Sequence, residues 1–261
     1  MNDIIILISN DMYSSRVFKP IIEKYPEIIS AIVDCKSVGG NIIKRIKRKI
    51  KIAKGAGFHF ALYKFLETTG YQILSILKGK PTFYKLAKKN NIKYIKTNDV
   101  SSDDFIKNIK KLQPKIIFST TTQIFKKRFF EHVSTPVLNG HGSLLPKYRG
   151  ATQYVWYLLN KDTNAGVTIH IMEQGIDTGN ILMQKEFFIE ENDSAYKIHY
   201  KIANELSKLY ADVCELKLED LKFTKQNEEN ISYCQIPSKN DIKLLRKEHK
   251  LIPLKDFFKL V

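Results

Sequence analysis

The chain has 261 residues, 43% of them hydrophobic, so it can bury a sizeable core, and this excludes a disordered chain. Its 43 Lys and Arg residues against 27 Asp and Glu give a net charge of +16, which favours an anionic partner, although a solvated lysine-rich surface would carry the same charge. The three cysteines are widely spaced without a C-x-x-C pair, which argues against a disulfide framework or a zinc site and favours a reducing, cytoplasmic compartment.

The first elements predict the opening of a βαβ unit. The short apolar run IIILIS at 4–9 predicts a buried strand. It follows an acidic residue and lacks the basic flank and the length of a signal peptide, so it is not interpreted as one. A loop enters a helix over 10–25, and IISAIVD at 28–34 predicts a second buried strand. No uncharged apolar stretch reaches roughly eighteen residues, so no membrane-spanning helix is expected.

A long basic segment, residues 38–90, comes next and predicts a helical insertion. Apolar residues recur in it at helical spacing among lysines and arginines, at Ile43, Ile46, Ile50 and Ala53. This pattern predicts a basic amphipathic helix, which either contacts phosphates or anionic lipid or simply packs its isoleucine face on the body. Residues 58–79 predict one or two further helices.

Beyond the insertion, strands and helices alternate again. The segments 92–97 and 115–120 predict strands, and 101–112 predicts a helix with a Ser and Asp cap. This alternation is typical of an α/β protein with a Rossmann-like, doubly wound and mostly parallel sheet. Residues 192–221 predict a long helix, and the basic remainder predicts a short helical tail on the body.

Two polar loops are candidates for a site. NGHGSLLPKYRG at 139–150 follows a short strand candidate and is too polar and glycine-rich for a core strand or a helix, so it predicts a loop at a strand's carboxyl end. GIDTG, which contains Asp177, joins two strands at 166–172 and 180–189 that predict a hairpin.

An amide, an imidazole and a carboxylate could meet between these loops. Asn139 and His141 would project to one side of an extended turn, and Asp177 could meet His141 across the crevice. Taken singly, each of the three is more simply a turn former or a structural residue. No G-x-G-x-x-G, P-loop or metal-ligand cluster is present. The other histidines are interpreted as structural or surface residues: His59, His132, His170, His199 and His249.

Both loops resemble signatures of a known family. NGHGSLLPKYRG resembles the N-x-H-x-S-L-L-P-x-x-R-G signature of the formyltransferases that use 10-formyltetrahydrofolate, and GVTIHIMEQGIDTGNIL resembles their second signature. The resemblance covers 115–190 and, less closely, 1–35. Gly142 departs from the pattern, since relatives commonly have Pro there, and we expect the glycine to loosen the loop without moving the trio.

The resemblance implies the formyltransferase fold and a set of site residues. The catalytic trio would be Asn139, His141 and Asp177. The formyl donor, 10-formyltetrahydrofolate, would lie on the backbone of two loops, at Thr120, Thr121, Gln123, Ile124, Gly175 and Ile176. The acceptor would contact Ser9, Asn10, Lys147 and Arg149. A structural ion pair would explain the presence of Arg149 equally well. Pro146 and Gly150 are expected to shape the loop. No metal is expected.

The implied reaction is attack of an amine on the formyl carbon. Asn139 and His141 would stabilise the negative charge that develops on the oxygen. Asp177 would hold the tautomer of His141, stabilise its charged form and accept a proton from the attacking ammonium through water.

The family's acceptors include methionyl-tRNA, glycinamide ribonucleotide, nucleotide-linked 4-amino sugars and hydroxyornithine. The tRNA enzymes usually carry a sizeable β-barrel domain after the catalytic part, whereas 71 residues, many of them predicted as helix, follow residue 190 here. The purine enzyme usually has a glycine-rich phosphate loop after its first strand, which SNDMYSSR lacks. We therefore expect a dTDP- or UDP-linked 4-amino sugar of surface polysaccharide synthesis, whose diphosphate suits the positive charge.

Several alternatives stay open. A methionyl-tRNA acceptor would use the basic helix at 44–51 as a phosphate contact, and nucleic acid is the less favoured partner. A non-catalytic basic module that docks on nucleic acid or on a membrane surface is the alternative from another class. A homodimer is left open. We expect a catalytic domain over 1–190, which includes the insertion at 38–90, and a C-terminal helix and tail over 191–261.

Overall fold

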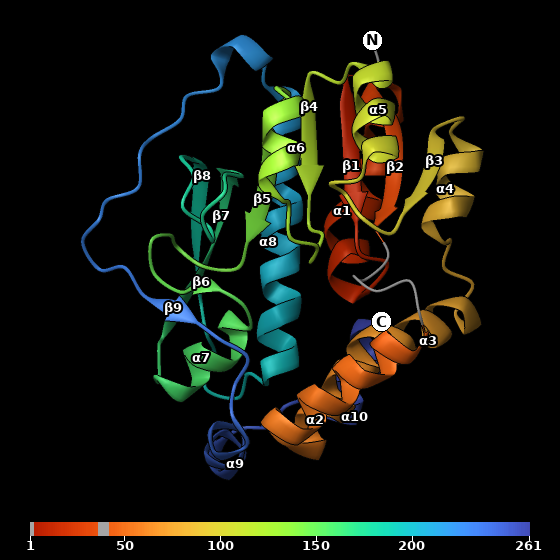
Figure 1. The fold of residues 1–261 in the computed structure, drawn as a ribbon. Helices are drawn as coiled ribbons and strands as arrows, with labels where there is room; N and C mark the ends of the chain where they lie inside the picture. The colour runs from red at the N-terminus through yellow and green to blue at the C-terminus, as the bar shows by residue number, and fades with distance from the viewer. Residues whose placement is uncertain (1–2, 36–41) are drawn as a thin grey trace.

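The centre of the protein is a seven-stranded sheet with the order β3-β2-β1-β4-β5-β7-β8 (Figure 1). The computed structural model describes residues 3–35 and 42–261, except the side chains of 42–49, 51 and 53. Five strands are parallel: β1 (Ile4–Ile8), β2 (Ile29–Cys35), β3 (Lys93–Thr97), β4 (Ile116–Ser119) and β5 (Val137–His141). The predicted α/β, mostly parallel sheet is confirmed.

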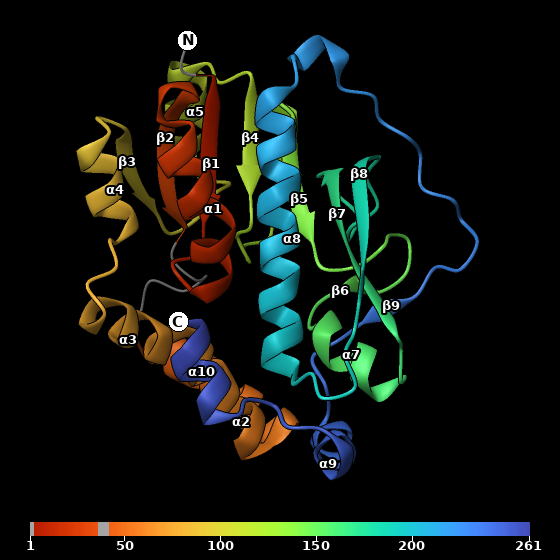
Figure 2. The ribbon, with the colours of Figure 1, turned by 180° about the vertical axis from the view of Figure 1, so that it is seen from behind.

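Helices cover both faces of the sheet. On one face lie α1 (Met12–Lys24) and α8 (Ala195–Glu215), in front in Figure 2. On the other lie α5 (Asp103–Leu112) and α6 (Lys127–His132), in front in Figure 1. Every residue of β1 is buried, because a strand in the middle of a parallel sheet needs apolar cover on both sides.

The strand order reverses between β1 and β4, so the loops that follow these two strands diverge and leave a crevice at their carboxyl ends. Ser9 follows β1, and its hydroxyl oxygen accepts a hydrogen bond from the Thr122 N–H at 3.2 Å. Its oxygen also lies 3.5 Å from Oγ1 of Thr121. Ser9, expected at the acceptor, and Thr121, expected at the donor, therefore lie side by side at this point.

The end of β5 corrects one expectation. Asn139, Gly140 and His141 were expected in a loop, but they are the last three residues of the strand. Gly140 allows this, because a Cβ on it would lie 3.0 Å from the ring of Tyr210, which packs there from α8. The Tyr210 hydroxyl lies 3.0 Å from the carbonyl oxygens of both Leu138 and Ser119. Packing against α8 thus overrides the low strand propensity of these polar residues.

The predicted hairpin is confirmed as β7 (Asn164–Ile171) and β8 (Ile181–Phe188). β7 is also antiparallel to β5, and its last residue, Ile171, pairs with Leu138. The carboxyl end of β7 therefore lies away from His141. The turn that follows β7 has to fold back along the sheet to reach the end of β5. Asp177 therefore does not lie near His141 because two parallel strands end at the same edge, as the sequence suggested.

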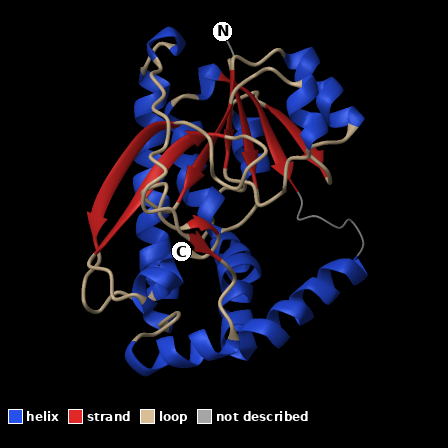
Figure 3. Cartoon of the chain, turned by 60° about the vertical axis from the view of Figure 1, so that its left-hand side comes forward, coloured by secondary structure: helices blue, strands red, loops and turns tan. Residues whose placement is uncertain are grey.

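The insertion forms a rod of helices at one end of the molecule (Figures 1 and 3). The rod consists of α2 (Ile42–Phe65), a π-helical turn at Leu66–Gly70 and α3 (Tyr71–Leu77). α2 is interrupted at Gly57, whose φ is +83°. The predicted helices are present, but most side chains of the expected basic face lie outside the described residues. α4 (Phe83–Lys89) packs on β2, β3 and α1 as the crossover helix between the two strands.

The chain after the hairpin returns to the site region. The predicted long helix is confirmed as α8, and it contributes to the core cluster that also holds β1 and α1. A segment then descends outside β8, as Figure 2 shows, to β9 (Tyr233–Cys234), which pairs with β6 (Arg149–Gly150). α7 (Gln153–Leu159), α9 (Lys239–Glu248) and α10 (Leu254–Leu260) complete the structure. In the described ranges no helix is long and apolar enough to cross a membrane.

Candidate active site

The structure brings together the three residues expected to form a catalytic trio. Nδ1 of His141 lies 3.4 Å from Oδ2 of Asp177. Asn139 precedes His141 by two positions on β5, so both side chains lie on the same side of the strand. His141 is 5% exposed and Asp177 is 15% exposed, so the pair is shielded from bulk water.

The turn after β7 carries Asp177 back to β5. Gly179 makes the return possible, because a Cβ there would lie 1.9 Å from the carbonyl oxygen of Ile171. Asp177 itself has a φ of +52°, in the left-handed region that aspartate tolerates better than most residues. The Gly150 N–H donates a hydrogen bond to Oδ2 of Asp177 at 2.8 Å. The buried side-chain amide of Gln226, in the segment after α8, donates to the carbonyl oxygens of Asp177 and Gly179, both at 2.8 Å.

The hydrogen bonds of His141 fix where its proton can move. Nε2 lies 2.9 Å from the carbonyl oxygen of Tyr148, and since a carbonyl only accepts, Nε2 carries a hydrogen. Nδ1, which faces Asp177, is then the nitrogen that gains or loses a proton. Burial lowers the pKa of His141, and the Asp177 carboxylate offsets part of this effect. The resting imidazole is therefore neutral and able to accept a proton at Nδ1.

Asp177 is the charged member of the pair. Burial alone would raise its pKa, but the opposing effects of His141, His170 and the Gly150 N–H are larger together and hold the pKa well below its usual range. Asp177 is therefore a carboxylate at neutral pH, placed where it stabilises an imidazolium at His141.

His170 belongs to the site and was missed. The sequence indicated only a structural or surface residue, whereas the register of β5 and β7 places His170 directly opposite Asn139. Its Nδ1 donates to the carbonyl oxygen of Ile171 at 2.8 Å, so Nε2 accepts a hydrogen bond from the Asn139 amide at 3.2 Å. Nε2 also lies 3.5 Å from Oδ1 of Asp177. His170 therefore fixes which end of the Asn139 amide carries the donors.

Arg149 anchors the loop that follows the trio. The guanidinium is buried, and its Nη2 donates to Oε1 of Gln226 at 2.7 Å, while Nη1 lies 3.4 Å from the Tyr233 hydroxyl. This geometry favours the anchoring explanation over contact with an acceptor. Lys147, by contrast, is exposed. Gln153, a second residue missed from the sequence, is buried with its amide nitrogen 3.2 Å from Nε2 of His141.

The residues expected around the donor fall into two groups. Thr120 and Gln123 are buried and face the body: the Thr120 hydroxyl donates to Ser14, and Gln123 accepts from the Val100 N–H. Ile124 and Ile176 present apolar side chains to solvent, 82% and 64% exposed.

The two remaining positions expected to contact ligands lie in exposed loops. Gly175 is in a tight turn where a Cβ would lie 2.2 Å from Oγ1 of Thr178. Asn10 is exposed, and its carbonyl oxygen accepts a hydrogen bond from the side chain of Gln72 in the rod. The binding roles of all these residues stay predictions.

Gly142 has a structural explanation. The residue is buried, and a Cβ would lie 3.1 Å and 3.3 Å from two carbon atoms of Ile202 in α8 and 3.4 Å from Oε1 of Gln153. Its carbonyl oxygen accepts a hydrogen bond from the Tyr157 hydroxyl at 3.1 Å. The glycine therefore fits a closely packed position, contrary to the expectation that it loosens the loop.

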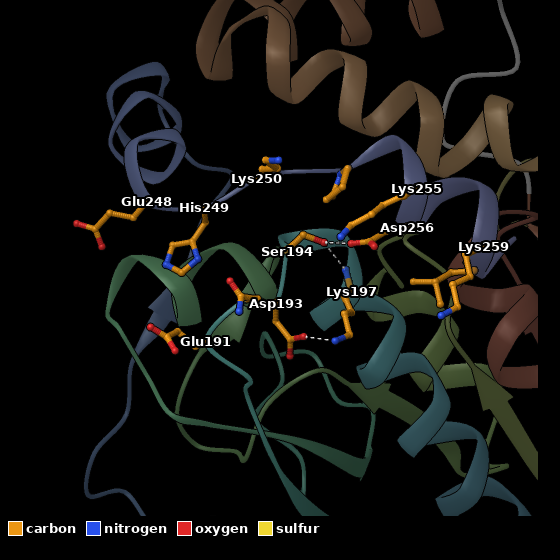
Figure 4. A pocket seen from close by; sticks show the side chains of 13 residues that line it. Glu191, Asp193, Ser194, Lys197, Glu248, His249, Lys250, Lys255, Asp256 and Lys259 are labelled. Atoms are coloured by element: carbon orange, nitrogen blue, oxygen red, sulfur yellow. Dashed lines mark hydrogen bonds and ion pairs between the residues drawn. The ribbon is translucent and has the colours of Figure 1, made fainter.

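A cavity of about 520 Å³ lies apart from the trio, at the start of α8 (Figure 4). None of the expected site residues lines it, and some of its polar side chains contact each other. Asp193 lies 2.8 Å from the ammonium of Lys197, and the Ser194 hydroxyl donates to Asp256 at 3.0 Å. Across the described part of the chain, no group of three or more His, Cys, Asp or Glu side chains could hold a metal ion.

Comparison with protein families gives a match to the model described as Formyl transferase over residues 72–214. Among curated proteins, a methionyl-tRNA formyltransferase of Caldanaerobacter subterraneus subsp. tengcongensis is 32% identical over 162 residues, which is 59% of this chain and 51% of that protein. The enzyme of the same name from Clostridioides difficile is 34% identical over 164 residues, 62% of this chain and 53% of that protein. The chain spans about half the length of these relatives.

Solved structures share the fold at lower identity. A sugar 3N-formyl transferase in the presence of dTDP and 5-N-formyl-THF has a TM-score of 0.55 at 23% identity, covering 90% of this chain and 69% of that one. The Helicobacter canadensis N-formyltransferase in complex with folinic acid and dTDP-3-aminofucose has a TM-score of 0.57 at 20% identity, covering 93% and 72%. Phosphoribosylglycinamide formyltransferase of Streptococcus pneumoniae has 0.56 at 15% identity, covering 82% and 98%.

Proposed function

Since the chain belongs to the formyl transferase family, we propose that it is an N-formyltransferase that moves a formyl group from 10-formyltetrahydrofolate to a primary amine. The observation that carries the proposal is the contact between His141 and Asp177, held by the Gly150 N–H and placed next to Asn139 on β5. The same three residue types were expected as a trio from two separate stretches of the sequence.

Asn139 stabilises the negative charge that develops on the formyl oxygen when the amine attacks. His170 accepts one hydrogen of the Asn139 amide, which leaves the other free to be donated to that oxygen. A donor held in position before the reaction stabilises the charge without having to reorganise.

His141 and Asp177 handle the proton of the attacking amine. The amine gains a positive charge as its bond to the formyl carbon forms, and it loses a proton to Nδ1 of His141 directly or through water. Asp177 stabilises the resulting imidazolium. The proton then moves to N10 of the folate as the bond between N10 and the formyl carbon breaks, which releases tetrahydrofolate and the formylated amine.

The loops that carry Ile124 and Ile176 offer an apolar surface to the folate that donates the formyl group. Ile124 follows β4 and Ile176 follows β7, the two neighbours of β5 in the sheet, and both side chains are exposed. A flat aromatic ring laid on these loops would cover them. Two of the structural neighbours carry folates according to their descriptions, which supports a folate donor for this chain.

For the acceptor we propose the amine of a nucleotide-linked amino sugar. Two neighbours were solved with dTDP or a dTDP-linked amino sugar, and a diphosphate suits the net charge of +16. A methionyl-tRNA acceptor is the second candidate, because the curated relatives with 32% and 34% identity carry that name.

The acceptor can be identified by release of tetrahydrofolate. The protein is incubated with 10-formyltetrahydrofolate and with dTDP- and UDP-linked 3-amino and 4-amino sugars, glycinamide ribonucleotide or charged methionyl-tRNA. Release with one of the nucleotide sugars supports the proposal. Release with tRNA alone would replace the acceptor and keep the reaction, whereas no release with any amine would contradict formyl transfer itself.

A further inference from the structure

The outer face of the rod carries a row of large apolar side chains in solvent. On α2 these are Phe58, Leu62 and Phe65, which are 71%, 41% and 45% exposed, and on α3 they are Ile73, Ile76 and Leu77, 54%, 63% and 76% exposed. We call these six residues the outer stripe. The three residues on α2 follow one another at four and three positions, and Ile76 and Leu77 lie three and four positions after Ile73 on α3, so each set lies along one face of its helix.

The outer stripe is not the side that holds the rod to the body. The opposite side is buried, with Phe60 at 1% and Tyr63 at 0% exposure. There, Oε1 of Glu67 lies 3.2 Å from Nδ1 of His199 in α8. The rod is thus apolar on two sides, of which one is packed, whereas an ordinary surface helix has one apolar face and one polar face.

The same segment carries more than half of the net positive charge of the chain. Residues 42–80 contain ten Lys and Arg residues and a single acid, Glu67, which gives nine of the sixteen net positive charges of the chain. Glu67 is buried and pairs with Lys64. Lys54, Lys78 and Lys80 are exposed, so cations flank the outer stripe near both ends and this segment adds no exposed carboxylate.

Two further large apolar side chains are exposed on the helix that lies beside the rod. Leu254 and Phe258 on α10 are 66% and 55% exposed. α10 lies beside the rod in Figures 1 and 2, and the ammonium of Lys78 lies 2.5 Å from the carbonyl oxygen of Phe258. Exposed apolar side chains therefore occur on two neighbouring elements of this end of the molecule.

We propose that the outer stripe docks on the surface of an anionic lipid bilayer. The interface of such a membrane accepts apolar side chains between its acyl chains and attracts lysines and arginines to its phosphates, so it suits both features of the rod. The rod lies along the membrane surface; among the residues that the structure describes, no helix is long and apolar enough to cross a membrane.

Other occupants fit less well. A nucleic acid would neutralise the cations but leave six large apolar side chains in water. A second copy of the chain, joined through a two-fold axis, would place the basic segment against itself.

The test is flotation of the whole chain with vesicles of phosphatidylcholine alone or mixed with phosphatidylglycerol, at low and high salt. We expect binding to the anionic vesicles only, weakened by salt. The double variant Ile76→Ser with Leu77→Ser should reduce the bound fraction at least about tenfold. The matched control is Phe188→Ser, which removes a side chain of 77% exposure from the end of β8 and should bind like the original chain.

Circular dichroism and thermal unfolding check that the variants are folded, and they do not depend on any enzymatic activity. Three results would overturn the proposal: no binding to anionic vesicles, binding that the double variant does not change, or a dimer in solution that the double variant dissociates. Retention of tRNA without vesicle binding would assign the surface to nucleic acid and would equally contradict it.

Discussion

Gln226 donates from its side-chain amide to the backbone carbonyl oxygen of Asp177 at 2.8 Å, so a residue of the C-terminal segment holds the carboxylate of the site in place from behind. The same side chain accepts a hydrogen bond from Arg149 at 2.7 Å. One buried amide thus joins the loop that follows β5 to the turn that follows β7. This link connects the two sequence signatures through a residue that belongs to neither.

Replacement of Gln226 by Leu should lower formyl transfer by one to two orders of magnitude and destabilise the fold by about 1–3 kcal/mol, since it leaves two carbonyls and a guanidinium short of a partner. Gln226→Glu is the informative companion, because it keeps the acceptor for Arg149 and removes the donors to Asp177. Urea unfolding and steady-state kinetics measure the two effects. If Gln226→Leu were fully active, the turn would hold its shape without this support.

Asn139→Ala should keep the fold and lose about 3 kcal/mol of transition-state stabilisation, roughly a hundredfold in kcat, because one donor to the formyl oxygen is gone. Asn240→Ala, an exposed asparagine on α9, is the control and should leave the rate unchanged. A rate for Asn139→Ala within twofold of the original would remove Asn139 from the mechanism.

The pH dependence of kcat/KM should report His141. Because Nδ1 must be unprotonated to accept a proton, activity should fall as the pH falls through the pKa of His141, which burial places below its ordinary value. Asp177→Asn removes the carboxylate that raises this pKa, so the acid limb should move to lower pH while the rate drops by about a hundredfold. An acid limb that stays in place in Asp177→Asn would show that another group controls it.

Gly142→Ala should cost about 1–3 kcal/mol of stability, because its Cβ would press on Ile202 at 3.1 Å. In the background Ile202→Ala, which removes the two nearest carbon atoms, the added cost should shrink. Urea unfolding of the four proteins in a double-mutant cycle measures this coupling. Independent, additive effects would mean that Ile202 is not what excludes a side chain at position 142.

His199 should make stability fall in mild acid. Burial lowers its pKa to about 4, against the partial offset of Glu67, whereas in the unfolded chain the value is about 6.5. Between these values the unfolded chain binds a proton that the folded chain does not, so its contribution is complete above pH 6.5 and is lost as the pH falls towards 4. Comparison with His199→Gln, over pH 4 to 7, isolates up to roughly 3 kcal/mol. Parallel stability curves for the two proteins would contradict the shift.

The sheet was predictable because its signal is local. Continuous β-branched runs such as Ile4–Ile8 predict buried parallel strands, and polar caps such as Ser102 before α5 mark helix starts. The end of β5 was not predictable, because packing and not local sequence determines it. Asn139–His141 extend the strand because Tyr210, seventy positions after Gly140, packs over that glycine.

The trio was predictable because its members lie in two recognisable stretches, but its supports were not. His170 enters through the pairing register of β7 with β5, and Gln226 through a segment that returns from beyond α8. Neither position carries a signal of its own, since a histidine in a strand and a glutamine in a polar tail are ordinary. His170 can be located only once β7 is known to pair antiparallel with β5, because that pairing places one residue of β7 opposite Asn139.

The support of the Asp177 turn also comes from a part of the chain that is synthesised after the sheet. Gly150 and Asp177 emerge from the ribosome before Gln226, and until Gln226 has emerged, the turn with Asp177 lacks the amide that holds its backbone. All seven strands of the main sheet precede this brace in the chain, since the last of them, β8, ends at Phe188. A nascent chain that ends before residue 226 would hold every strand of the main sheet but lack the amide that donates to Asp177 and Gly179.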